Sequence, residues 1–469
     1  MAGLPRRHDR TLTVPSRAVW CPISKTPARM STHRSRRPQP CRLLPWRLCY
    51  SLLLLPVVLT ALGLAFLSSR KVRQSLLGRR GGWQRMADQL RARDPAQPLV
   101  WFHTTSVGEF LQARPVIERL QADGVPCAVT LYSISGYRWL SRIRAQLPGV
   151  IMADYLPLDF RHNARRLLAL LRPAAVVHVK FDLWPNLVWE VAAAGVPQFL
   201  ISGTLHEKSL RQRHGVARAF YGAVYGALDG IYAVTEADRQ RFLAACPDHP
   251  RVRVFGDTRF DSVLDRKRTL QPPALPSLRG KSSILIVGSS WPPDEAVIFP
   301  PIQQALRERP ELGVILVPHE IDGPHLDAIE AAFRPWGVVR FSARDAAATD
   351  ARVVLVDSVG QLSALYAHAT LAYVGGAFTT GVHNVMEPAA MGVPAMFGPR
   401  YHNSPEAMEL LAQGCAFSIA DAPAFHERLQ ALLADAAATV DLGRRAQAYI
   451  EDQAGASQRC FAVIKETLA

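Results

Sequence analysis

Short apolar runs alternate with amphipathic stretches from about residue 97 to the C-terminal end of the chain. The runs are rich in Val, Ile and Leu, which is typical of strands buried on both faces of a parallel sheet. The stretches between them, such as 107–122, repeat their apolar residues at helical spacing. The pattern therefore predicts an α/β fold. The expected strands are 99–103, 126–132, 150–156, 174–181, 198–202, 231–234, 252–257, 283–288, 312–317, 352–356, 370–374 and 395–397.

A break in this alternation divides the chain into two units. Residues 266–282 carry lysine, proline and glycine without any period, a composition that suits an interdomain linker. We expect one Rossmann-like unit at 71–265 and a second at 283–469, facing each other across a cleft. The cleft would lie between the carboxyl edges of the two sheets, where ligands of parallel sheets bind.

The N-terminal region has a different pattern. Residues 1–42 are polar, basic and rich in Pro and Ser, and we expect them to be disordered. Cys49 to Ser68 are almost wholly apolar and about as long as a bilayer-spanning helix requires. Residues 43–70 are therefore expected to anchor the chain, first as a single span and second as a helix lying in the interface. Basic residues flank both sides, so the positive-inside rule does not fix the orientation.

Composition narrows the range of partners. The net charge of +16 is concentrated in the first eighty or so residues, which favours an anionic surface such as membrane lipid or nucleic acid. No basic motif interleaved with aromatic residues accompanies this charge, so we expect no nucleic-acid partner. The seven cysteines are scattered without the spacing of a zinc or redox site, which indicates a reducing compartment.

The segment 372–392 combines an apolar run, a turn rich in Gly and Thr, and a helix expected to begin at His383 or Asn384. The glycines let a ligand approach the backbone, and the N–H groups at a helix start favour a phosphate. Glu387, about one turn further on, would accept hydrogen bonds from ribose hydroxyls. An ordinary strand–turn–helix corner is the alternative. The residues expected around the anion are Gly375, Gly376, Gly381, His383, Asn384 and the Ser289 and Ser290 hydroxyls.

A second group of polar residues follows the strands of the first unit. Ser106 and Glu109 have the spacing of a capping box, so a plain helix start explains them as well as chemistry does. In the functional interpretation, Glu109 lies at the mouth of the cleft and takes a proton from an attacking hydroxyl. Lys180 and Asp182 end a strand, where a structural ion pair is the ordinary explanation. Lys208 lies in a basic stretch that is either a solvated helix face or a phosphate clamp.

Several of these stretches, in their order and spacing, resemble the motifs of the 3-deoxy-D-manno-octulosonic acid (Kdo) transferase family. Residues 106–109 match its S-V-G-E, 184–186 its W-P-N, and 256–261 its G-[DN]-x-K/R-[FY]-D. Residues 375–388 match its G-G…H-N-x-x-E-P, and the motif that follows is matched at 397–406. The resemblance runs from the membrane segment to near the C-terminus.

The resemblance implies a GT-B glycosyltransferase with an N-terminal transmembrane helix and with its catalytic domains on the cytoplasmic face of the inner membrane. It implies inverting transfer of Kdo from CMP-Kdo to the lipid A precursor, lipid IVA, in lipopolysaccharide biosynthesis, with Glu109 as the base. No two aspartates stand two residues apart, so we expect neither a D-x-D metal site nor a cofactor. The residues expected at the donor are Ser289, Ser290, His319, Gly375, Gly376, Gly381, His383, Asn384, Glu387, Asn403 and Glu406. Those expected at the acceptor are Ser106, Lys180, Asp182, Lys208 and Ser209.

Two other functions fit the same pattern. One is another enzyme of this architecture, such as a nucleotide-sugar epimerase, which would not need the membrane segment or the W-P-N motif. The other is a non-catalytic, membrane-anchored protein that binds a nucleotide sugar. The fold alone does not distinguish these functions. A measurement of catalytic turnover does.

Overall fold

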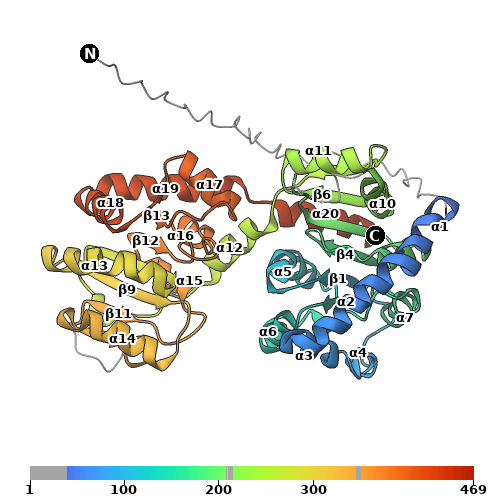
Figure 1. Cartoon of the computed structure of the whole chain (residues 1–469), viewed down its shortest axis with the longest axis horizontal. Helices are drawn as coiled ribbons and strands as arrows, with labels where there is room; N and C mark the ends of the chain where they lie inside the picture. Colours follow the sequence, from blue (N-terminus) through green and yellow to red (C-terminus); the bar gives the residue numbers. More distant parts are fainter. Residues whose placement is uncertain (1–39, 208, 210–214, 345–349, 469) are drawn as a thin grey trace, which may run out of the picture.

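Two parallel sheets of seven strands each organise the chain (Figure 1). The structure is a computed structural model that describes residues 40–207, 209, 215–344 and 350–468. The first sheet, in spatial order, consists of β3 (Val150–Tyr155), β2 (Cys127–Leu131), β1 (Val100–Thr104), β4 (Ala175–Val179), β5 (Gln198–Gly203), β6 (Gly230–Ala233) and β7 (Val252–Val254). The second consists of β10 (Val338–Arg340), β11 (Val353–Leu355), β9 (Leu312–Pro318), β8 (Ser283–Ser290), β12 (Leu371–Val374), β13 (Ala395–Phe397) and β14 (Ala416–Ser418).

Helices cover both faces of each sheet, which is why the central strands are buried along their whole length. In the first unit they are α4 (Gly82–Gln89), α5 (Val107–Ala122), α6 (Ile134–Ile143), α7 (Arg161–Leu171), α8 (Pro185–Ala193), α10 (Gly215–Tyr225) and α11 (Glu236–Ala245). In the second they are α13 (Pro292–Glu308), α14 (Gly323–Phe333), α15 (Leu362–Leu365), α16 (Met386–Ala390), α17 (Pro405–Ala412), α18 (Ala422–Ala434) and α19 (Ala436–Asp452).

In both sheets the strand order reverses beside the first strand. The chain moves outward from β1 to β2 and β3, then returns to place β4 on the other side of β1. The second sheet repeats this arrangement, with β9 and β12 on opposite sides of β8. Loops that follow the two strands at such a reversal diverge to opposite faces of the sheet and leave a crevice at the carboxyl edge. Each unit therefore has one preferred place for a ligand.

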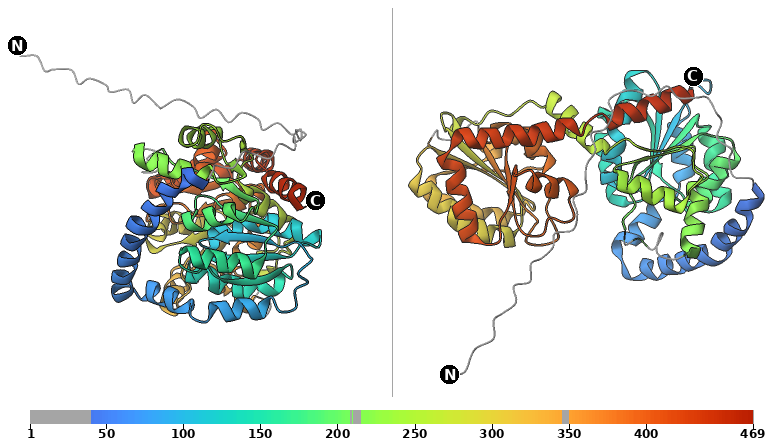
Figure 2. Two further views of the ribbon diagram at one scale, coloured as in Figure 1. Left: turned by 90° about the vertical axis from the view of Figure 1, so that its right-hand side faces the viewer. Right: turned by 90° about the horizontal axis from the view of Figure 1, so that it is seen from above.

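Two helices cross between the units. α12 (Thr258–Thr269) leaves the first unit and packs on α5, α16 and α19. α20 (Ala456–Leu468) returns from the second unit and packs its apolar side into the core of the first, as the red helix beside the green and blue unit in Figure 2 shows. Asp261 of α12 accepts hydrogen bonds from the N–H groups of Gly455 (2.9 Å) and Ser457 (3.1 Å) at the start of α20. One carboxylate therefore ties the two crossings together.

A long apolar helix precedes the first unit. It runs through α1 (Pro40–Cys49), the π-helical turn Tyr50–Leu54 and α2 (Leu55–Ser68), and α3 (Arg70–Gly78) follows directly. An 18-residue window of the helix Leu43–Ser68 has a mean hydropathy of 2.3, and the helix could cross a membrane by length and composition. The helix lies against the first unit along one side (Figure 2).

The predicted α/β class and the two parallel sheets are confirmed. Two edge strands, β10 and β14, were not expected. Only one of the three residues in each is buried, so neither forms a continuous buried run. The expected linker 266–282 begins inside α12, which continues to Thr269. Residues 456–468 belong to the stretch expected to form the second unit, yet α20 packs on the first. That helix is amphipathic, and the sequence does not reveal which core covers its apolar side.

Burial of one histidine predicts a pH dependence of stability. His178 on β4 is fully buried, its Nε2 lies 3.2 Å from Gln198 Oε1, and its Nδ1 has no partner among the described residues. Burial lowers the pKa of His178 to about 4. Between pH 6.5 and 4 the unfolded chain therefore binds more protons than the folded one, so the free energy of unfolding falls as the pH drops through this window, by at most ~1.4 kcal/mol per pH unit.

Denaturant unfolding in detergent at pH 7 and pH 5 measures this dependence. The free energy of unfolding of the parent protein should be lower at pH 5 than at pH 7. In His178→Phe, whose side chain does not titrate, the difference between the two pH values should be smaller by the contribution of His178. An identical difference in the variant and the parent protein would show that His178 does not cause the acid sensitivity.

Candidate functional site

Many of the sequence-predicted residues lie at the carboxyl edges of the two sheets. In the first unit, Glu109 lies just after β1, and Lys180 and Asp182 lie just after β4, the two strands that flank the reversal. In the second unit, Ser289 and Ser290 end β8 and the glycine turn follows β12, again the two strands at the reversal. Residues far apart in the sequence are brought together because parallel strands end at a common edge.

Glu109 occupies the N-terminus of α5 and forms the predicted capping box. Its Oε2 accepts hydrogen bonds from the Ser106 N–H at 3.1 Å and from the Ser106 hydroxyl. Its Oε1 lies 3.8 Å from Lys180 Nζ, and no described residue donates a hydrogen bond to that oxygen. The Glu109 side chain is 12% exposed. One oxygen therefore stabilises the helix start, while the other remains open at the crevice.

The carboxylate of Asp182 is bound by two residues that the sequence did not point to, His103 and Thr105. His103 Nε2 lies 3.0 Å from Asp182 Oδ2, and the Thr105 hydroxyl donates to the same oxygen. Burial pushes the pKa of Asp182 upward, but the hydrogen bonds and charge of His103 and the bond from Thr105 outweigh it, so the net shift is downward. The carboxylate is thus kept ionised and oriented at the end of β4. Lys180 beside it adopts a left-handed backbone (φ 68°).

His103 is itself fixed by a buried chain of hydrogen bonds. Trp101 Nε1 donates to Thr130 Oγ1 at 2.9 Å, and Thr130 Oγ1 lies 3.0 Å from His103 Nδ1. The ionised carboxylate of Asp182 can only accept, so His103 Nε2–H donates to it. Either Thr130 Oγ1 or His103 Nδ1 supplies the hydrogen of the other bond. The sequence signal for this chain is weak, because a histidine and a threonine inside strands look like ordinary core residues.

The glycine corner after β12 is tightly packed. A Cβ on Gly375 would lie 2.3 Å from the Ser289 carbonyl oxygen, and one on Gly381 would lie 2.6 Å from the Asn403 side chain. Gly376 has φ 91°, which a side chain would strain. The glycines therefore allow the corner to pack on its own protein neighbours, and their presence does not by itself require a ligand.

Most N–H groups of the corner already have acceptors. Gly375 donates to the Gly288 carbonyl at 2.9 Å, and Gly376 donates to Asp294 Oδ2 at 2.9 Å. Asp294 is fully buried and also accepts from the Trp291 N–H and from the Tyr373 hydroxyl. A buried carboxylate therefore occupies the place where glycine amides were expected to meet a phosphate. Its signal in the sequence is the spacing from Trp291 to Asp294, which is that of a helix N-cap and its N3 residue.

The helix after the corner is shorter than predicted. α16 begins at Met386, not at His383 or Asn384, and has only five residues. The Asn384 side chain turns back to accept from the Met386 N–H at 3.0 Å. The N–H groups of Asn384 and Val385 form no hydrogen bond with a described residue. The donors available to an anion are therefore loop amides, and a dipole from so short a helix adds little.

Three rings stack beside the corner. The His319 ring stacks on both Trp291 (4.3 Å between ring centroids) and His383 (4.8 Å), with nearly parallel planes. Trp291 Nε1 donates to His383 Nε2 at 3.0 Å. Burial and the neighbouring His319 lower the pKa of His383, which favours the neutral ring that accepts this bond. The two predicted histidines are therefore brought together, and Trp291, which the sequence analysis did not select, joins them.

The side chains of Ser290 and Asn403 have hydrogen-bond partners within the protein. Ser290 is buried and its hydroxyl donates to Glu295 Oε1 at 2.8 Å, so it does not face the corner as a free donor. Ser289 is half-buried, with a left-handed backbone (φ 56°) that turns the chain out of β8. Asn403 Nδ2 donates to the Val382 carbonyl at 3.0 Å and closes the far side of the turn.

Both predicted donor-site carboxylates hold arginines of the crossing helix α12. Glu387 Oε1 accepts from Arg266 Nη1 at 2.7 Å, and Glu406 Oε1 accepts from Arg259 Nη1 at 3.1 Å. The charges of Asp257 and then Glu406 raise the pKa of Arg259. Glu387 Oε2 accepts no hydrogen bond from a described residue. These carboxylates therefore connect the second unit to the helix that leaves the first.

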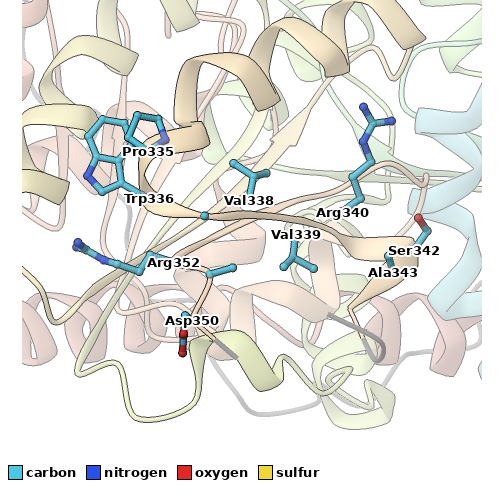
Figure 3. A pocket seen from close by; sticks show the side chains of 11 residues that line it. Pro335, Trp336, Val338, Val339, Arg340, Ser342, Ala343, Asp350 and Arg352 are labelled. Atoms are coloured by element: carbon cyan, nitrogen blue, oxygen red, sulfur yellow. The ribbon is translucent and has the colours of Figure 1, made fainter. Parts of the chain in front are cut away.

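Two predicted acceptor residues fall at a gap in the described chain. Lys208 lies outside the described residues, and the Ser209 N–H donates to the His206 carbonyl at 2.9 Å. Across the described parts of the chain, no three His, Cys, Asp or Glu side chains are grouped as a metal site requires. A cavity of about 710 Å³ lies at the outer edge of the second sheet, around Trp336, Arg340 and Arg352 (Figure 3). None of the predicted site residues lines it.

Comparisons with known proteins agree with the motifs. The family model for 3-deoxy-D-manno-octulosonic-acid transferase (kdotransferase) matches residues 77–262. The chain is 25% identical to the 3-deoxy-D-manno-octulosonic acid transferase of Haemophilus influenzae over 430 residues, covering 90% of this chain and 99% of that protein. It is 30% identical to the enzyme of the same name from Chlamydia pneumoniae over 337 residues, covering 69% of this chain and 74% of that protein.

A solved structure shares the architecture. UDP-GlcNAc 2-epimerase from Neisseria meningitidis, bound to UDP-GlcNAc, superimposes with a TM-score of 0.56 at 15% sequence identity, covering 79% of this chain and 99% of that one. At this identity the likeness shows the fold alone. It agrees with two Rossmann-like units of the GT-B type and does not extend to the epimerase reaction.

Packing at the glycine corner can be tested by substitution. Gly375→Ala places a methyl group 2.3 Å from a backbone oxygen that cannot rotate away, so we expect a loss of about 1–3 kcal/mol in the free energy of unfolding, as for other overpacked sites. Gly323→Ala is the matched control, because an added Cβ there meets nothing within 4 Å. Thermal unfolding of both variants measures the difference, and equal stability of the two would contradict the packing described for the corner.

Proposed function

Because the chain belongs to the 3-deoxy-D-manno-octulosonic acid (Kdo) transferase family and is therefore a glycosyltransferase, we propose that it transfers Kdo from CMP-Kdo to lipid IVA in lipopolysaccharide biosynthesis. The hydroxyl oxygen of the acceptor attacks the anomeric carbon of Kdo while the bond from that carbon to the CMP phosphate breaks. CMP leaves with the electron pair, the hydroxyl proton passes to Glu109, and the anomeric configuration inverts in this single step.

The observation that carries this proposal is the arrangement of Glu109. One carboxylate oxygen is fixed by Ser106, so the group has a defined orientation at the carboxyl edge of β1. The other oxygen accepts no hydrogen bond from a described residue and has a lysine at 3.8 Å. A carboxylate with one free, oriented oxygen is what a general base requires. Lys180, Asp182, Ser106, Ser209 and Lys208 are proposed to contact the acceptor.

The donor is proposed to bind at the edge of the second sheet. The loop amides of Asn384 and Val385 have no acceptor among the described residues and would meet the CMP phosphate, where charge develops as the bond breaks. The rings of His319 and His383 border the same corner. Glu387 Oε2 would accept from the ribose while Oε1 keeps its bond to Arg266. The remaining predicted donor residues would not contact the donor through a side-chain hydrogen bond but would define the shape of the corner. They are Ser289, Ser290, Gly375, Gly376, Gly381, Asn403 and Glu406.

The membrane segment supports a lipid acceptor. The apolar helix Leu43–Ser68 is weak evidence for membrane association on its own, but it fits a substrate that is confined to a bilayer. We propose that the protein works on the cytoplasmic face of the inner membrane. A soluble nucleotide-sugar donor and a lipid acceptor would then meet between the two units.

The decisive experiment follows CMP release by purified protein supplied with CMP-Kdo and lipid IVA. We expect Glu109→Gln to lower the rate by about 10²–10⁴-fold, the usual contribution of a general base. Glutamine still satisfies a capping box, so the helix start should survive. Glu118→Gln on the same helix is the matched control, since Glu118 pairs with Arg114 at an exposed position and with no other described residue. We expect it to retain the parent rate.

An unchanged rate in Glu109→Gln would remove Glu109 from the mechanism. No turnover by the parent protein, with CMP still bound, would favour the non-catalytic binding protein instead. Epimerisation of a nucleotide sugar in place of transfer would favour the other enzyme class.

The proposed reaction uses neither a metal nor a cofactor, because the phosphate charge is met by amides and the chain lacks a D-x-D motif. We therefore expect the initial rate to be the same with excess EDTA as with millimolar Mg²⁺. A rate that EDTA abolishes and Mg²⁺ restores would contradict metal-independent transfer.

A further inference from the structure

The apolar N-terminal helix has two different sides. One side packs on the first unit: Leu43, Tyr50 and Leu55 are buried there, and Trp46 and Leu59 pack against the same core cluster. The opposite side carries large apolar side chains in the open, including Leu52 (67% exposed), Leu64 (65%) and Leu67 (73%). A bilayer-spanning helix would expose apolar side chains around its whole circumference, whereas this helix divides them between protein and surroundings.

The polar side chains in the first half of the helix face the protein. Arg47 Nη2 donates to the Trp189 carbonyl at 2.8 Å, and its Nη1 lies 3.4 Å from Glu190. The Ser51 hydroxyl donates to Asn186 Oδ1 at 3.3 Å. The Tyr50 hydroxyl lies close to the buried carboxylate of Asp159. Moving this half of the helix into a bilayer would break these contacts and leave a charged group in hydrocarbon, which costs several kcal/mol.

The other end of the helix is also fixed to the first unit. α3 begins at Arg70, and the Ser75 hydroxyl donates to the Tyr132 carbonyl at the end of β2. Arg73 donates to the carbonyls of Phe66 and Leu67 and so caps α2. The helix is therefore attached near both ends and lies across the unit as a strap (Figure 2).

Length excludes a span in this arrangement. The contacts with the first unit extend to Leu59, which leaves residues 60–68, or roughly 14 Å of helix at about 1.5 Å per residue. The hydrocarbon core of a bilayer is about 30 Å thick. A helix held at both ends by one unit cannot carry its two ends to opposite sides of the membrane.

We propose that residues 43–68 form a one-leaflet anchor, in place of the single span that length and composition predict. The exposed leucine side lies among the acyl chains of one leaflet, and the packed side stays on the first unit. Both ends of the helix then lie on the side of the catalytic units. This topology also accounts for basic residues on both flanks, because both flanks remain at the same anionic surface.

Reporter fusions test the topology in intact cells. A green fluorescent protein fused to the N-terminus, and separately to the C-terminus, fluoresces only where it folds, in the cytoplasm, whereas alkaline phosphatase at either end is active only outside it. We expect the same compartment for both ends. Opposite compartments would overturn the proposal and restore the single span. These fusions leave the helix unchanged, so the result does not depend on any variant folding.

Cross-linking in native membranes tests the docking itself. A short bifunctional thiol reagent should join the pair Ser51→Cys and Asn186→Cys, and a protease site inserted after Pro95, in an exposed loop, should then leave both fragments together on a denaturing gel. The pair Leu52→Cys and Asn186→Cys is the control, since Leu52 faces away from the protein, and the parent chain reports the native cysteines. No cross-link with the first pair, or equal cross-linking with both, would overturn the docked arrangement.

Discussion

The relation between the two units depends on the charges around α12. Arg259 at the start of α12 donates to Asp257 of the first unit and to Glu406 of the second. Arg266, further along the same helix, donates to Glu387. The same helix packs on α5, whose first turn carries Glu109. These partly buried ion pairs have hydrogen-bonded partners on each side, so removing any one charge would leave another without compensation. The proposed base and the proposed donor carboxylates are therefore supported by one helix.

The polar groups at the carboxyl edges of the two sheets are hydrogen-bonded in different ways. At the first, a buried chain from Trp101 through His103 fixes Asp182, and the capping box fixes Glu109, so negative charge is concentrated where a hydroxyl would lose a proton. At the second, Asp294 accepts from the amide of Gly376, while the N–H groups of Asn384 and Val385 further along have no acceptor among the described residues. Negative charge thus faces the proposed acceptor, and N–H donors face the proposed donor phosphate, which is the polarity that transfer requires.

The sequence predicted the features that have a period or a motif. Apolar runs gave the parallel sheets, and the spacing of Ser106 and Glu109 gave the capping box, because both depend on neighbours in the chain. The pattern could not predict that Asp294 would fill the glycine corner, that Trp291 would stack on His319, or that Glu387 and Glu406 would bind arginines of α12. Each of these contacts joins residues far apart in the chain, and no pattern in the sequence around either residue indicates its partner. The late start of α16 was also not predicted: the helix begins at Met386, after a local turn in which the Asn384 side chain accepts from the Met386 N–H.

The strap and the proposed base are connected through few contacts. α3, which continues the strap, binds the Tyr132 carbonyl at the end of β2, and the next residue, Ser133, donates its N–H to the Thr105 carbonyl at 2.8 Å. Thr105 begins the short loop that leads to Ser106, the N-cap of α5, whose first turn carries Glu109. A helix held in one leaflet therefore fixes the distance between the bilayer surface and this loop, because no flexible linker intervenes. A transmembrane span joined to the first unit by a flexible linker would leave that distance variable. A fixed distance suits an acceptor whose acyl chains stay in the leaflet, because its hydroxyl then lies at a constant distance from the bilayer surface.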